Sequence, residues 1–146
     1  ILTGWAAVID LGERAPGAII TASHLAAYEA QAVECGRMIL RTGWGRRWGS
    51  ADFFTDYPAL DNNAVEWLIS HNIRLLGLEQ PSVSIIDSLE LHSRFLSSGV
   101  ILVENLANLH EITLGRVFVA ALPLKLDGID GSPARVIAIE GESILA

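Results

Sequence analysis

The chain has 146 residues, 51% of them hydrophobic and only 18% charged, with a formal net charge of -7. Nucleic acid and anionic membranes are poor partners for such a chain, because both attract basic protein surfaces. Charged residues usually make up about 25% of a soluble domain, so apolar surface is abundant here and solubilising charge is scarce. We therefore expect one domain over residues 1–146, part of whose apolar surface is covered in a homo-oligomer or by a second polypeptide.

The single cysteine, Cys35, excludes an internal disulfide and is compatible with the reducing cytoplasm, where we expect the protein to be located. No apolar run approaches the roughly 20 residues that span a bilayer, and no signal peptide is visible. The chain begins at Ile1, directly before an apolar run. This start predicts that an N-terminal segment is missing.

The first half of the chain alternates strand and helix signals. Residues 6–10, a short apolar run that ends at Asp10, predict a buried strand. Thr21 is a suitable N-cap for a helix that Gly36 would end. Residues 38–41 predict a second strand, and a loop rich in glycine and tryptophan follows it.

The pattern continues in the middle of the chain. Asp61 is a suitable N-cap for a helix that leads to a strand at 73–78. Asp87, with Glu90 three residues later, resembles a capping box before a helix that ends near Gly99. The next predicted strand, residues 100–103, is entirely apolar.

The chain ends differently, with predicted strands at 116–124 and 135–139 joined by turns and no helix. Alternating strands and helices predict an α/β domain. The continuously apolar strands indicate a sheet covered on both faces. Because the last two strands lack a connecting helix, we expect a mixed sheet with flanking helices.

His92 and Glu104 are the residues most suited to chemistry. His92 shares a helix face with Leu89, Phe95 and Leu96, so it should point toward the core. Glu104 follows four apolar residues at the carboxyl end of a predicted strand, where active sites of open α/β sheets are found. Imidazole and carboxylate groups bind zinc or manganese. The alternative is a hydrogen-bonded core histidine beside a glutamate that reaches solvent.

Arginines and tryptophans gather in the loop at 41–48. A basic loop with interleaved aromatics can hold single-stranded nucleic acid, but packed aromatics with solvated arginines are the simpler interpretation in an acidic protein. We expect Trp44 to border a substrate pocket while Arg46 and Arg47 face solvent. Core packing would explain Trp44 equally well.

From residue 6 to residue 139, the order of segments resembles the cyclase family of metal-dependent hydrolases, which includes kynurenine formamidase (arylformamidase) and isatin hydrolase. The most specific segment is Gly99-Val-Ile-Leu-Val-Glu-Asn-Leu-Ala-Asn108, and Pro81-Ser82-Val83 matches a short family motif. The other matching segments are 7–10, 40–44, 64–68, 73–77, 121–126 and 128–133.

The resemblance implies a swivelling β/β/α fold and hydrolysis of a small amide or lactam by a metal-activated water. It implies that His92 and Glu104 are the C-terminal metal-site residues, each either a ligand or a proton-transfer group, with divalent Zn or Mn as the cofactor. Ser82, in the family motif, belongs with Trp44 among the expected substrate-pocket residues.

Two departures from the family pattern matter. The His-x-Gly-Thr-His-x-Asp-x-Pro-x-His stretch, which supplies most metal ligands in the family, does not occur in these 146 residues. Ser84 stands where relatives often carry aspartate. The chain therefore reads as the C-terminal portion of an active hydrolase whose other piece is absent or lies in a separate chain. The alternative, from a different functional class, is a non-catalytic remnant or assembly module with the same fold.

Overall fold

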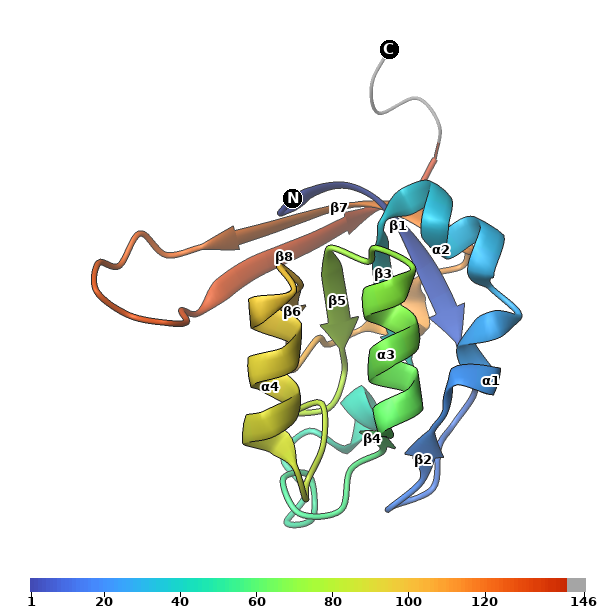
Figure 1. The fold of residues 1–146 in the computed structure, drawn as a ribbon, viewed down its shortest axis with the longest axis vertical. Helices are drawn as coiled ribbons and strands as arrows, with labels where there is room; N and C mark the ends of the chain where they lie inside the picture. Colours follow the sequence, from blue (N-terminus) through green and yellow to red (C-terminus); the bar gives the residue numbers. More distant parts are fainter. Residues whose placement is uncertain (142–146) are drawn as a thin grey trace.

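The computed structural model describes residues 1–141 and has a curled six-stranded sheet with four helices (Figure 1). The sheet order is β6-β5-β3-β1-β7-β8. The strands of this sheet are β1 (Thr3–Asp10), β3 (Arg37–Arg41), β5 (Leu75–Leu78), β6 (Ile101–Val103), β7 (Arg116–Pro123) and β8 (Ala134–Ile139). The helices are α1 (Ala22–Ala26), α2 (Glu29–Cys35), α3 (Asn62–Ser70) and α4 (Ser88–Ser97), with 3-10 turns η1 (Trp44–Arg47) and η2 (Leu109–Glu111).

The sheet is mixed, as the sequence predicted. β6, β5, β3 and β1 run parallel to their neighbours, whereas β7 pairs antiparallel with both β1 and β8. The antiparallel end follows from the turns that join β7 to β8 without a crossover helix. A mixed sheet with flanking helices is the α/β fold class that the sequence predicted, so that prediction is confirmed.

Two predicted features of the helices are wrong in detail. The single helix expected from Thr21 to Gly36 is divided into α1 and α2, because Tyr28 has non-helical backbone angles of -112° and 10°. Its hydroxyl donates to the Asp10 carbonyl 2.9 Å away, which ties the break to the end of β1. At α4, the Asp87 side chain makes no capping hydrogen bond, so the predicted capping box does not form. Asp61 does cap α3, accepting from the Ala64 amide at 2.7 Å.

Two short strands were not predicted. β2 (Ile19–Ile20) and β4 (Ala59–Leu60) form a parallel two-stranded pair outside the main sheet. Each has two residues, which is too short to show an alternating pattern. The pair holds the chain that enters α1 against the chain that enters α3, since both helices follow these strands directly.

The helices cover one face of the sheet. A core that includes Leu25, Leu68 and Phe95 joins them to the inward residues of β1, β3 and β5. The opposite face has a smaller core in which Leu106, Leu109 and Ile112, from the loop after β6, pack on Ala6, Val8, Ile39, Val117 and Val119. This loop covers only part of the second face, and a groove of about 1340 Å³ lies beside it. No helix in residues 1–141 is long and apolar enough to cross a membrane.

The β7–β8 hairpin extends from the body as an arm (Figure 1). Several large apolar side chains on it are exposed: Leu122, Leu124, Leu126, Ile129 and Ile137. β8 is also an edge strand of the sheet. Exposed apolar area of this kind marks a contact surface for protein, and an edge strand is a template for pairing with another chain.

We propose that this arm joins copies of the chain. In residues 122–139, Lys125 and Arg135 balance Asp127 and Asp130, giving 2 - 2 = 0, so the whole net charge of -7 lies elsewhere. Two acidic copies can therefore meet at the arm without like-charge repulsion at the contact.

We expect the purified protein to be a homo-oligomer, and we expect the double variant Leu124→Lys, Ile129→Lys to shift it toward monomer. Light scattering after size-exclusion chromatography measures both masses. Val33→Lys is the matched control, because Val33 is similarly exposed but lies on α2. A monodisperse monomer for the unaltered protein would contradict the proposal.

Candidate functional site

His92 and Glu104 meet at one side of the sheet. Glu104 is the first residue beyond β6, and His92 lies on α4, which packs beside that strand. The His92 Nε2 atom is 3.1 Å from Glu104 Oε1. Both side chains are about a quarter exposed, at 28% and 27%. The expected approach of these two residues is confirmed; their catalytic and metal-binding roles stay predictions.

The imidazole of His92 is held by its own helix. Its Nδ1 atom is 2.7 Å from the Ser88 carbonyl oxygen, one turn earlier on α4. A carbonyl oxygen only accepts hydrogen bonds, so Nδ1 carries the proton in this contact. Nε2 is then the ring atom left to face Glu104. A backbone partner on one ring nitrogen is the usual way in which proteins orient a histidine that binds metal through the other.

The helix face around His92 differs from the prediction. Leu91 and Phe95 are the buried residues of α4, whereas Leu89 and Leu96 are 86% and 56% exposed. The apolar stripe is therefore centred on Leu91 and Phe95. His92 lies at the border of this stripe, which explains why it is half-buried and reaches the end of β6.

The burial of Glu104 affects its acidity. Loss of hydration raises the pKa of the Glu104 carboxyl, while the charge of His92 and its hydrogen bond oppose this rise. A carboxyl with a raised pKa exchanges protons closer to neutral pH than an exposed glutamate does. The pair thus combines an oriented imidazole with a carboxyl suited to proton transfer.

Ser82 is connected to the His92–Glu104 pair by a second serine, Ser88. The Ser82 hydroxyl is 2.8 Å from the Ser88 hydroxyl, which is 3.3 Å from His92 Nδ1. Ser82 was predicted as a substrate-pocket residue. The structure places it beside His92, and its contact with substrate stays a prediction.

Tyr57 also belongs to this region and was not predicted. It is buried, and its hydroxyl donates to the Ser84 carbonyl at 3.0 Å. Burial raises the pKa of the Tyr57 phenol and the nearby negative charge of Glu104 adds to the rise, while the Ser82 hydroxyl opposes it. No local pattern distinguishes Tyr57 in the sequence, because only the fold brings the loop before β4 to the end of β6.

Trp44 is buried in a small aromatic cluster with Phe53 and Tyr57. It is 1% exposed and does not line the groove on the second face of the sheet. Its role in a substrate pocket stays a prediction. Within the aromatic cluster, Tyr57 is the residue that connects Trp44 to the region of His92 and Glu104. Arg46 is exposed as expected, but Arg47 is half-buried, pairs with Asp52 and places its guanidinium 4.7 Å from the centre of the Trp44 ring.

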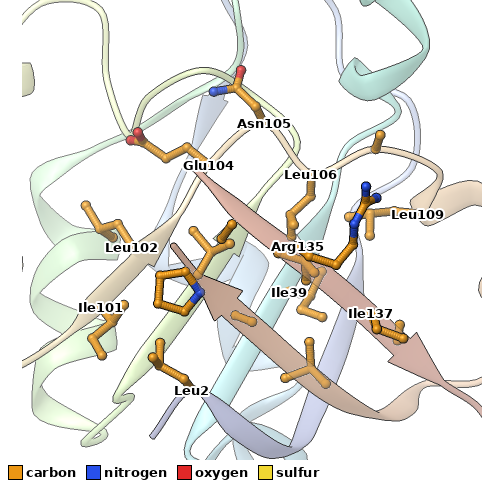
Figure 2. Close-up of a pocket in the computed structure, with 18 of the residues that line it drawn as sticks. Leu2, Ile39, Ile101, Leu102, Glu104, Asn105, Leu106, Leu109, Arg135 and Ile137 are labelled. Atoms are coloured by element: carbon orange, nitrogen blue, oxygen red, sulfur yellow. The ribbon is translucent and has the colours of Figure 1, made fainter. Parts of the chain in front are cut away.

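The groove on the second face of the sheet leads to the site. It runs between the two sheet edges, β6 and β8, and is mostly apolar. Glu104 and Asn105 lie at one end of it, with Ile101, Leu102 and Arg135 along its sides (Figure 2). Glu104 therefore contacts His92 on one side and borders the groove on the other. The groove lies on the face of the sheet opposite α4.

The donor atoms at the pair fit a divalent metal ion in their chemistry. A neutral imidazole with an outward Nε2 lone pair and a carboxylate oxygen are ordinary ligands of Zn and Mn. Three protein ligands are typical of catalytic zinc sites. Within residues 1–141, no group of three or more His, Cys, Asp or Glu side chains is placed to hold a metal ion. Of the three or four protein ligands that such a site needs, the described residues offer two at this place, His92 and Glu104.

The mixed sheet with helices on one face, and a histidine–glutamate pair at a strand end, define an α/β protein with a candidate site at the carboxyl ends of its parallel strands. The family model described as putative cyclase matches residues 1–84, more than half of the chain, and the chain belongs to this cyclase family. This confirms the resemblance found in the sequence.

Individual relatives agree with this assignment. A kynurenine formamidase of Bacillus thuringiensis strain Al Hakam is 33% identical over 142 residues, covering 89% of this chain and 66% of the relative. A solved structure described as a predicted metal-dependent hydrolase from Bacillus stearothermophilus has a TM-score of 0.78 and 27% identity, covering 94% of this chain and 63% of that one. Isatin hydrolase A from Ralstonia solanacearum has the same TM-score and identity, covering 95% and 61%. The chain therefore spans less than two thirds of the length of these relatives.

Proposed function

We propose that this chain provides the His92–Glu104 part of a metal-dependent hydrolase that cleaves the C–N bond of a small amide or lactam, with an arylformamide-like compound as substrate. One observation carries the proposal: the oriented imidazole of His92 meets the Glu104 carboxyl at 3.1 Å, with Nδ1 anchored on Ser88. The hydrolase relatives support the same reaction class. The buried free thiol of Cys35 agrees with the cytoplasmic location that we also propose.

In this proposal His92 Nε2 and Glu104 Oε1 hold the metal ion, Zn or Mn. When bound, the ion would lower the pKa of a coordinated water and polarise the scissile carbonyl. We assign proton transfer to the second oxygen of Glu104, which takes a proton from the attacking water and returns it to the leaving nitrogen. The carboxyl group suits both steps because one oxygen can face the metal while the other faces the attacking water.

Metal removal tests the proposal. We expect dialysis of the full-length protein against a chelator to reduce hydrolysis of N-formylated anilines and of isatin at least about hundredfold, since the ion supplies most of the activation of water. Addition of Zn or Mn should restore it, and metal analysis with a thermal melt should show binding separately from activity. Unchanged hydrolysis in metal-free protein would exclude the mechanism.

The same experiment distinguishes the second function, a non-catalytic assembly module. The observation that favours it is that residues 1–141 bring together only two candidate ligands. A module would fold and keep its melting temperature, but it would show neither metal uptake nor hydrolysis with any compound in the panel.

A further inference from the structure

A second, smaller cavity of about 190 Å³ lies where three loops meet at the carboxyl end of the sheet. The segment after β3 contributes Gly45, Trp48 and Phe53, the end of β5 contributes Glu79, and the loop after β6 contributes Asn105 to Ala107. Asn105 directly follows Glu104, and it lines the larger groove as well. The cavity is thus next to the site described above, on the other side of the loop that leaves β6.

Glu79 gives this cavity a polar wall. It is 2% exposed, and its Oε2 atom accepts from the Thr42 amide at 2.6 Å and from the Thr42 hydroxyl at 3.0 Å. These two bonds fix the carboxyl group. In the described part of the chain, Glu79 Oε1 takes part in no hydrogen bond, so it is the acceptor left for a ligand.

Gly45 keeps the space in front of Oε1 open. A Cβ atom on Gly45 would lie 3.0 Å from Glu79 Oε1 and 3.2 Å from the Leu106 carbonyl oxygen. Both of these residues line the cavity. The absence of a side chain at Gly45 therefore leaves room beside two acceptor oxygens, Glu79 Oε1 and Leu106 O.

The other wall is aromatic. Trp48 and Phe53 meet edge to face, with ring centroids 5.0 Å apart. Trp48 is 65% exposed, so one face of its indole is available at the cavity. Such a wall favours a flat aromatic ring, which gains from stacked or edge contacts with both side chains.

We propose that this cavity binds a planar aromatic compound that carries an N–H donor, with the ring against Trp48 and Phe53 and the N–H on Glu79 Oε1. Acceptor oxygens on one wall and aromatic rings on the other select both features of the ligand. The proposal that a ligand binds here depends only on the shape and chemistry of the cavity. The further step, that the cavity holds the aromatic ring of the hydrolase substrate, rests on the proposed function.

Three matched probes test the donor requirement. Indole has the ring and the N–H, 1-methylindole lacks the donor, and benzofuran replaces the N–H with oxygen. We expect metal-free protein to bind indole about tenfold more tightly than either analogue, because loss of the donor leaves a buried acceptor unpaired. Ligand-observed NMR titration measures the three affinities without any hydrolysis.

Gly45→Ala should weaken indole binding at least about tenfold, since its Cβ would occupy the space beside Glu79 Oε1. Gly131→Ala is the matched control, because a Cβ there meets nothing within 4 Å. Trp48→Leu should also weaken binding, and Phe54→Leu, which changes an equally exposed ring outside the cavity, should not.

Equal affinity for the three probes, or indole binding that survives Gly45→Ala in folded protein, would overturn the proposal. If the unaltered protein binds indole as expected but hydrolyses none of the amides or lactams tested, the proposed function would be contradicted. The binding site proposed here would not be affected by that result. Binding at millimolar concentration without discrimination among the probes is the outcome expected of an adventitious hydrophobic contact, and it too would overturn the proposal.

Discussion

Glutamine in place of Glu104 is expected to lower hydrolytic activity by about 10²–10⁴ while the protein stays folded. The amide has nearly the same shape, and its N–H group can donate to His92 Nε2, which is 3.1 Å from Glu104 Oε1. It cannot accept a proton from water, and it is a far weaker metal ligand than a carboxylate. The activity of the complete protein, its metal content and its melting curve are the three measurements.

Stability should not fall with this change. Burial raises the pKa of Glu104 above its unfolded value, so this group favours folding at low pH and that contribution is lost as pH rises through the folded pKa. At neutral pH the buried carboxylate therefore opposes folding, and a neutral amide removes that cost. We expect an unchanged or higher melting temperature for Glu104→Gln in metal-free protein, where the loss of a metal ligand plays no part.

Two further variants test whether the loss of activity comes from the pair and not from the loss of a charge in general. Glu111→Gln removes a carboxyl from the same groove, away from His92, and should retain activity. His92→Ala should lose as much activity as Glu104→Gln, because each removes one half of the pair. Full activity in both pair variants would refute their assigned roles, and joint loss of activity and folding in both would support a purely structural pair.

The sequence predicted this pair from two simple rules. Parallel strands place their carboxyl ends at one edge, and a residue on the apolar face of a helix points toward the sheet. Glu104 after β6 followed the first rule, and His92 on α4 followed the second only in part, since it lies at the border of the apolar stripe. The exact stripe was wrong, since Leu89 and Leu96 are exposed, because an isolated helix pattern does not show which side meets the sheet.

Glu79 shows what the same rule could have found. It follows β5, a continuously buried strand, just as Glu104 follows β6. A carboxyl at that position needs a partner, and the structure supplies Thr42 from the end of β3. The partner is 37 residues away in the sequence, so the position was predictable and the pairing was not.

Tertiary contacts decided the remaining features. Tyr28 divides the first predicted helix where its hydroxyl bonds to the end of β1, and Tyr57 joins the site through its bond to the Ser84 carbonyl, 27 residues away. Neither contact is encoded by local periodicity. From the sequence, the excess of apolar residues predicted that some apolar surface is covered by another chain. It did not predict that this surface lies on the arm or along the groove.

Alanine in place of Trp44 is expected to lower the free energy of unfolding by about 3–5 kcal/mol. The side chain is 1% exposed and stacks on Phe53, with ring centroids 6.4 Å apart. Its indole N–H donates to the Phe53 carbonyl at 3.1 Å, and Arg47 covers its ring. Its removal leaves a large cavity and an unpaired carbonyl, which together give the large expected effect.

Trp44→Phe and Trp48→Ala make this prediction specific. Phenylalanine keeps most of the ring but not the N–H donor, so a smaller loss of about 1–2 kcal/mol is expected. Trp48 is 65% exposed, and its removal should change stability by about 0.5 kcal/mol or less. Denaturant titration measures all three variants. The KM of the complete enzyme separates the two roles of Trp44, because an unchanged KM in Trp44→Phe would leave core packing as its sole role. A strong rise of KM at nearly unchanged stability would instead show that Trp44 contacts the substrate.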